Sequence, residues 1–347
     1  MERLICFDLE GPLSPQDNAY EVMSLINGGD RIFEVLSRYD DIITLEKRTG
    51  YEPGDTLALI VPFLLLHDIC EKDIKQVSDR AKIVDGAVEM IAKLKEEGWH
   101  VHIISTSYEQ HAKNIGKKLG VSEQNISCTK LDLHSLKKNI KNKLSLVEHV
   151  ERDIIGLSQN DEIEIVKRLD DFFYKELKDT FDVFSNVRVM GGQRKVDAML
   201  KIADMHKKSP GEITVVGDSI TDYKMLKKVK EAGGISVVFN GNEYAAPYAN
   251  IGLASMDMRV LCFITQFEDN KDAFEFVRAW ESGRDTFIKN PDKISGASVD
   301  IKKVLRGFEE KNFPYFHFLG DNPNIEEVVK THKMFRRAVR GQAAKLG

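Results

Sequence analysis

The residues nearest the start of the chain that could do chemistry are two carboxylates, Asp8 and Glu10. They follow a short apolar run, residues 4–7, and a Gly-Pro pair comes directly after them. Such a run is typical of a buried parallel strand, which Gly and Pro would end. Open α/β sheets bind ligands at the carboxyl ends of their strands, so we expect both carboxylates at a ligand site. The alternative is that they only cap the helix that follows.

A second pair of carboxylates, Asp218 and Asp222, has the same setting. Residues 213–216 form another apolar run, which ends in Gly217 immediately before Asp218. Asp222 comes four residues later, one helical turn on and on the same side. Two acid pairs at two strand ends can converge on one hard cation. Mg²⁺ is the natural candidate, because it prefers oxygen ligands and keeps water and substrate phosphate in its shell.

These segments resemble the motifs of haloacid dehalogenase superfamily phosphatases. Asp-Leu-Glu-Gly at 8–11 matches the first motif of that family, and Gly-Asp-Ser-Ile-Thr-Asp at 217–222 matches the fourth. Ser105 follows a third apolar run, where the family keeps a Ser or Thr that hydrogen-bonds the phosphoryl group. Lys195 follows a Gly-Gly pair, where the family keeps its phosphate-binding Lys. Four matches in the right order argue against capping as the only role of Asp8.

The resemblance implies a Mg²⁺-dependent phosphatase that hydrolyses a small phosphorylated metabolite. Asp8 would attack phosphorus to give an aspartyl-phosphate, and Glu10 would protonate the leaving oxygen and later deprotonate the attacking water. The other positions that the resemblance implies are Mg²⁺ ligands at Asp8, Asp218, Asp222 and the backbone carbonyl of Glu10, and phosphate contacts at Ser105, Thr106 and Lys195.

Glu10 departs from the commonest family pattern, which has Asp two places after the nucleophile. Phosphoserine:homoserine phosphotransferases, which are close to phosphoserine phosphatases, also have Glu there. The resemblance therefore leaves phosphotransfer to an alcohol as an alternative to hydrolysis. Archaeal proteins with the same Asp-Leu-Glu-Gly-Pro opening suggest another alternative, an accessory or regulatory subunit of an energy-converting hydrogenase.

Two residues are candidates for recognition of the leaving group. Asp17 falls near the acid that meets the substrate amine in phosphoserine phosphatases. Arg48 could contact a substrate carboxylate, because its planar fork suits that anion. The alternative is that both are ordinary surface residues.

The composition is that of a globular protein. The 347 residues are 42% hydrophobic and 30% charged, and the formal net charge of −5 gives no general attraction to nucleic acid. Four cysteines, at positions 6, 70, 128 and 262, have no zinc-site spacing, so we expect reduced thiols and a cytoplasmic location. The first residues show no basic segment followed by an apolar core, so we do not expect secretion, and the longest apolar run, residues 57–66, is too short to span a membrane.

We expect a doubly wound parallel, Rossmann-like α/β core with helical additions. Residues 131–151 are basic, 160–184 have the pattern of one acidic amphipathic helix, and 330–345 are basic and amphipathic. Residues 256–347, the C-terminal extension, lie outside the resemblance. We expect their apolar faces to pack on the core or to form a homodimer. The expected divisions are a core of 1–15, 84–127 and 186–255, a helical cap of 16–83, a helical insertion of 128–185 and a helical C-terminal extension of 256–347.

Overall fold

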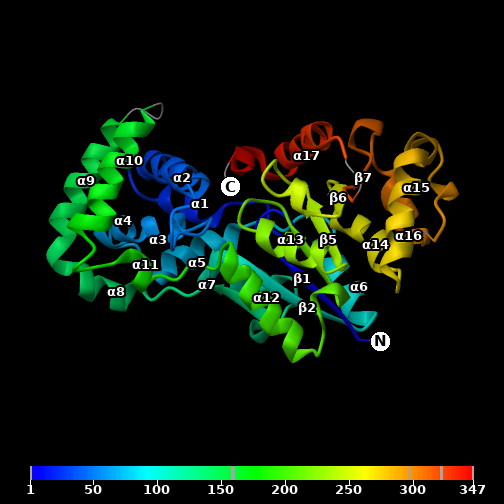
Figure 1. Cartoon of the computed structure of the whole chain (residues 1–347), viewed down its shortest axis with the longest axis horizontal. Coiled ribbons are helices and arrows are strands. Elements are labelled where there is room, and N and C mark those ends of the chain that lie inside the picture. The colour runs from blue at the N-terminus through cyan, green and yellow to red at the C-terminus, as the bar shows by residue number, and fades with distance from the viewer. Residues whose placement is uncertain (1, 158–160, 297, 321–322, 346–347) are drawn as a thin grey trace.

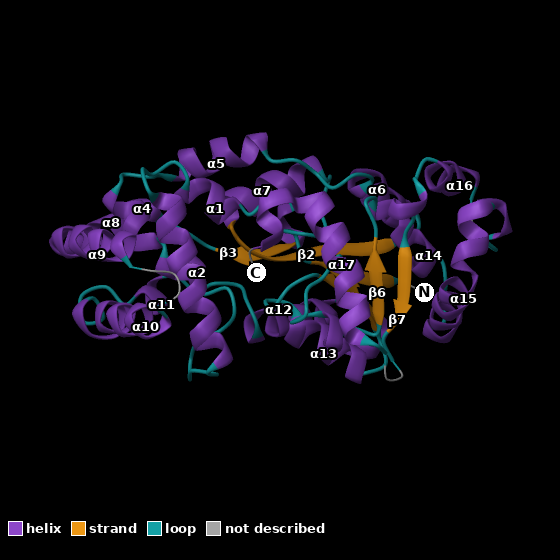
Figure 2. Ribbon diagram, turned by 90° about the horizontal axis from the view of Figure 1, so that it is seen from above, coloured by secondary structure: helices purple, strands orange, loops and turns teal. Residues whose placement is uncertain are grey.

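The computed structural model describes residues 2–157, 161–296, 298–320 and 323–345, of which 342 and 345 are described by their backbone alone. One sheet of seven strands runs through the middle of the molecule, with helices at both ends (Figure 2). The first six strands are parallel and the seventh is antiparallel to its neighbour, so the α/β fold expected from the sequence is confirmed. In spatial order the strands are β3 (Ile126–Thr129), β2 (Trp99–Tyr108), β1 (Arg3–Phe7), β4 (Ile213–Gly217), β5 (Ile235–Phe239), β6 (Ile251–Ala254) and β7 (Tyr315–Phe318).

The central strand β1 pairs with β2 on one side and with β4 on the other. Phe7 lies opposite Val216, and the next backbone N–H, that of Asp8, donates to the Val216 carbonyl at 2.8 Å. This register brings the carboxyl ends of β1 and β4 side by side. The two acid pairs, 210 residues apart in sequence, therefore begin at one edge of the sheet.

Helices cover both faces of the sheet, as a doubly wound fold requires. Alternate residues of a strand point to opposite faces, so Leu4 and Cys6 of β1 pack on one side and Ile5 and Phe7 on the other. The first face is covered by α12 (Gln193–Met205), α13 (Tyr223–Glu231) and α17 (Ile325–Arg340). Helices that pack on the second face are α6 (Ala87–Glu96), α7 (Glu109–Lys118), α14 (Cys262–Thr265), α15 (Asn270–Lys289) and α16 (Val299–Arg306).

The cap and the insertion form one helical body at one end of the molecule (Figure 1). Their apolar side chains share a single core, in which Phe63 and Phe172 lie with ring centroids 6.2 Å apart and Tyr39 stacks on Phe173 at 6.4 Å. The cap contributes α1 (Asn18–Met23), α2 (Gly29–Leu45), α3 (Thr56–Leu59), α4 (Val61–Leu66) and α5 (Glu71–Arg80). The insertion contributes α8 (Leu133–Ile140), α9 (Leu144–Gly156), α10 (Glu162–Asp171), a π-helical turn (Phe172–Glu176) and α11 (Val183–Asn186).

The prediction of a single helix over residues 160–184 is wrong. Residue 160 lies outside the described residues, and the rest is α10, the π-helical turn and α11. The turn carries two consecutive buried aromatic side chains, Phe172 and Phe173, into the shared core. Asp182 then starts α11 afresh, because its carboxylate accepts from the backbone N–H of Phe184 at 3.0 Å.

The C-terminal extension, which the sequence analysis expected to be helical, also contributes a strand. Its strand β7 pairs antiparallel with β6 and covers that edge of the sheet, with Ile251 opposite Phe318. The aromatic run of β7 packs inward, and Phe316 meets Trp280 of α15 edge to face at 5.1 Å. The extension thus completes the core. No helix in the described part of the chain combines the length and the apolarity that crossing a membrane requires.

Candidate active site

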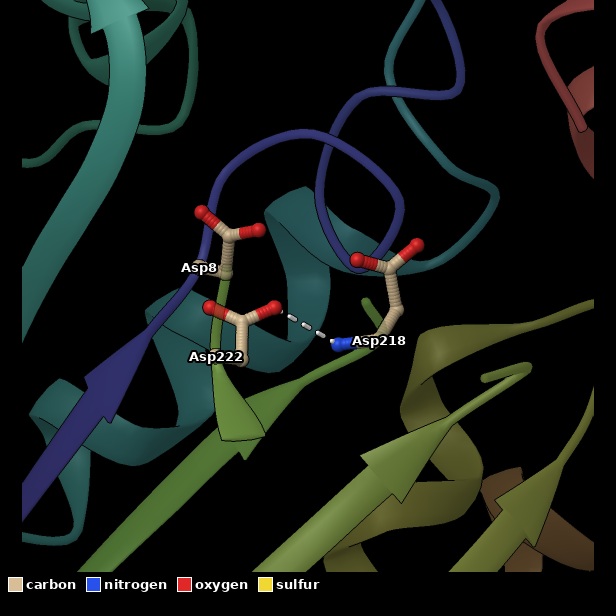
Figure 3. A group of neighbouring side chains, drawn as sticks. All are labelled: Asp8, Asp218 and Asp222. Atoms are coloured by element: carbon tan, nitrogen blue, oxygen red, sulfur yellow. Dashed lines mark hydrogen bonds between the residues drawn. The ribbon is translucent and has the colours of Figure 1, made fainter. Parts of the chain in front are cut away.

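Three buried carboxylates meet above the ends of β1 and β4 (Figure 3). One oxygen from each of Asp8, Asp218 and Asp222 lies within 4.8 Å of the others. Their exposed fractions are 4%, 1% and 0%. Buried like charges at this spacing repel each other strongly unless cations lie among them.

The loop after β4 fixes the carboxylate of Asp222 through its own backbone. Asp222 directs Oδ2 back to the N–H groups of Asp218 and Ser219, at 3.0 and 3.2 Å. Gly217 permits this close turn, because a Cβ there would lie 2.6 Å from the Cβ of Asp222. The conformation of the loop is therefore encoded locally, by one glycine and one acid.

Lys195 supplies a cation between two of the acids. It lies in the first turn of α12, is fully buried, and its Nζ donates to Oδ1 of Asp8 and to Oδ1 of Asp222, both at 2.7 Å. Burial alone would lower the pKa of Lys195, but the carboxylates of Asp222 and Asp8 outweigh it and hold that pKa above its usual value. Lys195 is therefore protonated at neutral pH.

The surroundings of Asp8 also shift its pKa. Burial is the main cause that raises its pKa above the usual value, the Asp222 carboxylate adds to this, and Lys195 opposes it. A further cation beside Asp8 would favour its ionised form.

Two arginines that the sequence analysis did not single out reach Asp218 from α17. Both Arg336 and Arg340 donate through Nη1 to Oδ2 of Asp218, the latter at 3.0 Å. The other oxygen, Oδ1, is buried and has no hydrogen-bond partner among the described residues. Their four-residue spacing on a basic amphipathic stretch was visible in the sequence. Nothing local indicated a partner 118 and 122 residues away.

Gly11 is required beside this contact. Its φ of +101° is one that side-chain-bearing residues rarely adopt, and a Cβ there would lie 2.1 Å from Oδ2 of Asp218.

Glu10 does cap a helix, as the structural alternative for this acid proposed. Its Oε1 accepts from the backbone N–H of Asn18, the first residue of α1, at 3.0 Å. Burial, and after it the Asp17 carboxylate, raise the pKa of Glu10 to about 7. His111 lies 3.7 Å away, but burial lowers its pKa to about 3, so it is neutral and offers no charge to Glu10. Asp8 caps none of the described helices, and its carboxylate accepts a hydrogen bond from Lys195.

The C-terminal part of β2 presents Thr106 to the cavity rather than Ser105. Thr106 lines the cavity above the acids, and its Oγ1 is buried without a hydrogen-bond partner among the described residues. Ser105 is fully buried, its Oγ accepts from the N–H of Ser107 at 3.1 Å, and it is not among the residues that line the cavity. Of the two, Thr106 is the one placed to meet a ligand.

The cavity lies between the strand ends and the helical body. From the core and its loops the cavity is lined by Asp8, Glu10, Thr106, residues 218–221 and Arg340, and from the cap side by Asp17, Phe33, Ser37, Asp40, Asp41, Gly54, Thr56 and Leu57.

The two leaving-group candidates have different positions. Asp17 lines the cavity, and its carboxylate also caps α1 by accepting from the N–H of Tyr20 at 2.9 Å. Arg48 does not line it. Arg48 donates to Asp170 and Glu46, and its guanidinium lies over the ring of Tyr174. The structure thus gives Arg48 partners within the helical body, away from the lining of the cavity.

A clasp of charged residues holds the helical body to the helix that carries Lys195. Glu52 accepts from the N–H of Gln193 at 2.9 Å and from Nζ of Lys224 at 2.7 Å. Asp55 forms a bidentate ion pair with Arg194, at 2.5 and 3.2 Å. Both acids belong to the cap, so the cap fixes the N-terminal ends of α12 and α13.

Comparison with known proteins shows which solved structures share this architecture. No protein-family model matches the chain, and no curated protein does. Among solved structures, gene product AF1437 from Archaeoglobus fulgidus is 27% identical over 100% of this chain and 99% of its own, with a TM-score of 0.78. A structure described as the phospho-aspartyl intermediate analogue of phosphoserine phosphatase is 16% identical over 75% of this chain and 97% of its own, with a TM-score of 0.50. This chain has the haloacid dehalogenase fold.

The haloacid dehalogenase fold implies Mg²⁺, and the acids of this chain fit that ion. Mg²⁺ takes oxygen ligands, and three carboxylates offer oxygens within 4.8 Å of one another. Oδ1 of Asp218 is a buried carboxylate oxygen without a partner among the described residues, which a cation would satisfy. The backbone carbonyl of Glu10 stays a predicted ligand.

Proposed function

We propose that this chain is a Mg²⁺-dependent phosphatase that hydrolyses a small phosphomonoester through an aspartyl-phosphate on Asp8. The observation that carries the proposal is the contact of Lys195 with both Asp8 and Asp222, in a group of three buried carboxylates beside the cavity at the strand ends. The phosphoserine phosphatase that shares this fold is described with an analogue of a phospho-aspartyl intermediate, which supports the same chemistry here.

The first chemical step forms one bond and breaks another at phosphorus. A carboxylate oxygen of Asp8 attacks, and the bond from phosphorus to the leaving oxygen breaks. Glu10 donates its proton to that oxygen, so that an alcohol leaves. A pKa near 7 suits this role, because both the protonated and the ionised form of Glu10 are then present near neutral pH.

The second step regenerates the enzyme. Glu10, now a carboxylate, removes a proton from a water molecule that attacks phosphorus, and the bond from Asp8 to phosphorus breaks to release phosphate. Its capping contact with Asn18 holds Glu10 in place through both steps. General acid–base catalysis of this kind contributes ~10²–10⁴ in rate.

Positive charge and hydrogen-bond donors around phosphorus complete the site. Lys195 offers an ammonium next to the attacking oxygen, and Thr106, which lines the cavity, offers a hydroxyl that has no hydrogen-bond partner among the described residues. Mg²⁺ held by Asp8, Asp218 and Asp222 would offset the repulsion between the Asp8 carboxylate and the anionic ester.

Replacement of Asp8 tests the proposal. We expect Asp8→Asn to lose turnover of every phosphomonoester that the wild type hydrolyses with Mg²⁺, while its circular dichroism and urea midpoint stay native. The control is Asp197→Asn, an exposed acid on the helix that carries Lys195, which should keep full turnover. Retained Mg²⁺-dependent hydrolysis by Asp8→Asn would contradict the proposal. The same assays with added homoserine report whether an alcohol replaces water as the acceptor.

A further inference from the structure

Six charged side chains are buried together in the candidate site. The acids are Asp8, Asp218 and Asp222. The cations are Lys195, which bridges Asp8 and Asp222, and the two arginines of α17, Arg336 and Arg340, which share one oxygen of Asp218. None of the six side chains is more than 6% exposed.

By formal charge this cluster is neutral, with three negative and three positive groups. An uncompensated charge inside a protein is costly, so the net charge of a buried cluster decides what can enter it. A Mg²⁺ ion alone would leave two surplus positive charges, and a phosphate dianion alone would leave two surplus negative charges. The two together would restore neutrality.

The geometry allows a cation to enter while the arginines stay. Both guanidinium groups are bound to Oδ2 of Asp218, whereas Oδ1 is buried and unpartnered among the described residues. Thr106, at the wall of the same cavity, has a hydroxyl without a partner there that an anion could take. Ligands of both signs therefore have contacts to make without displacing a charged group.

The helix that carries the arginines is fixed on both sides of the cluster. His332 accepts from the backbone N–H of Gly241 at 3.1 Å, and Nε of Arg340 donates to the carbonyl of Pro15 at 3.1 Å. The two guanidinium groups are thus held in the site by the fold.

We infer that the arginines of α17 make a divalent cation and a phosphate group bind as a pair, each weakly alone and each strengthening the other. Such coupling is reciprocal, so phosphate should raise the affinity for Mg²⁺ by the same factor as Mg²⁺ raises the affinity for phosphate. The inference rests on the site of the proposed function, but it concerns binding and does not need turnover.

The test is a binding measurement on the full chain. Isothermal titration calorimetry with Mg²⁺ alone, inorganic phosphate alone, and each in the presence of the other gives four dissociation constants. We expect a coupling between about 5-fold and about 150-fold, the usual range for linked sites. Equal affinity for Mg²⁺ with and without phosphate would overturn the inference, whatever the phosphatase assays show.

Two variants should shift the net charge of the cluster in opposite directions. Arg340→Met keeps the apolar stem but removes one positive charge, so Mg²⁺ alone should bind more tightly than it does to wild type. Asp218→Asn removes one negative charge, so inorganic phosphate alone should bind more tightly. Arg337→Met, at an exposed position on the same helix, should behave as wild type.

Urea unfolding without ligands shows which variants fold. One folded variant with its expected shift in affinity is enough to support the inference. If neither variant that folds differs from Arg337→Met, the arginines do not set the coupling and the inference is wrong. If the coupling is present but no phosphomonoester is hydrolysed, the inference holds and the proposed function fails.

Discussion

At the scale of single residues, the site is an arrangement of charged groups whose interactions are strong because the groups are buried. Lys195 is fully buried and is held by two carboxylates at 2.7 Å. The energetic worth of such a group appears when it is removed, because its partners are then left buried and uncompensated.

Removal of the lysine should therefore destabilise the fold. We expect Lys195→Met to lower the free energy of unfolding by about 3–5 kcal/mol, since it leaves Asp8 and Asp222 without their cation. Urea denaturation measures this. Lys201→Met, at an exposed position of the same helix, should change stability by less than about 0.5 kcal/mol, and an equal loss in both variants would contradict the account.

The buried acids predict how stability depends on pH. Burial is the first cause that raises the pKa of Glu10, from 4.5, and of Asp40, from 3.8, to about 7 in each case. Between about pH 4 and 7 the folded protein keeps protons that the unfolded chain releases, so the free energy of unfolding falls as the pH rises and levels off above pH 7.

Asp40→Asn isolates one of these contributions. The amide oxygen can still accept from the hydroxyl of Tyr51, but the group no longer titrates. Urea unfolding across this pH range should show a shallower fall for the variant than for wild type. Parallel profiles would show that Asp40 is not a source of the pH dependence.

At the scale of elements, strand ends place the acids and helices bring the cations. The sequence was sufficient for Asp8, Asp218 and Asp222, because an apolar run followed by Gly or an acid is a local pattern that predicts where a strand ends. It did not indicate Arg336 and Arg340, because their partner lies far away in the chain and only the packing of α17 brings them together. For the same reason it could not show that Arg48 would pair with Asp170 within the helical body.

Glu52, one of the two acids of the clasp, contacts both α12 and α13. Its carboxylate sits at the N-terminus of α12, where a negative charge is favourable, and also pairs with Lys224. We expect Glu52→Ala to lower the free energy of unfolding by about 1–2 kcal/mol, from the lost helix-terminus interaction and ion pair. Glu231→Ala, which removes an exposed acid at the end of α13, is the control for urea denaturation. Equal changes would argue against the clasp.

At the scale of the whole molecule, segments that the sequence analysis predicted to be separate additions are parts of shared cores. The periodic apolar positions of 16–83 and 128–185 predicted helices, but periodicity does not say against what a face packs, and the two segments share one core. The extension likewise buries its aromatic residues against the sheet. A homodimer through the extension stays a prediction that light scattering can test.

The shared core predicts that the two segments lose structure together. Phe172→Ala should lower the free energy of unfolding by about 3–5 kcal/mol, because a buried ring between both segments is replaced by a cavity. Limited proteolysis of the variant should then cut residues 16–83 and 128–185 at similar rates. Ile163→Ala, where the wild-type side chain is 82% exposed, should have almost no effect. Cleavage of one segment alone would contradict a single helical body.

The central claim is that Asp8 carries the phosphoryl group. Borohydride reduces an acyl phosphate but not a free carboxylate, so the enzyme can be treated during turnover with Mg²⁺ and substrate and then mapped by peptide mass spectrometry. The account predicts a reduced side chain at position 8 only when both Mg²⁺ and substrate are present. Turnover without reduction at position 8, or reduction at another carboxylate instead, would contradict it.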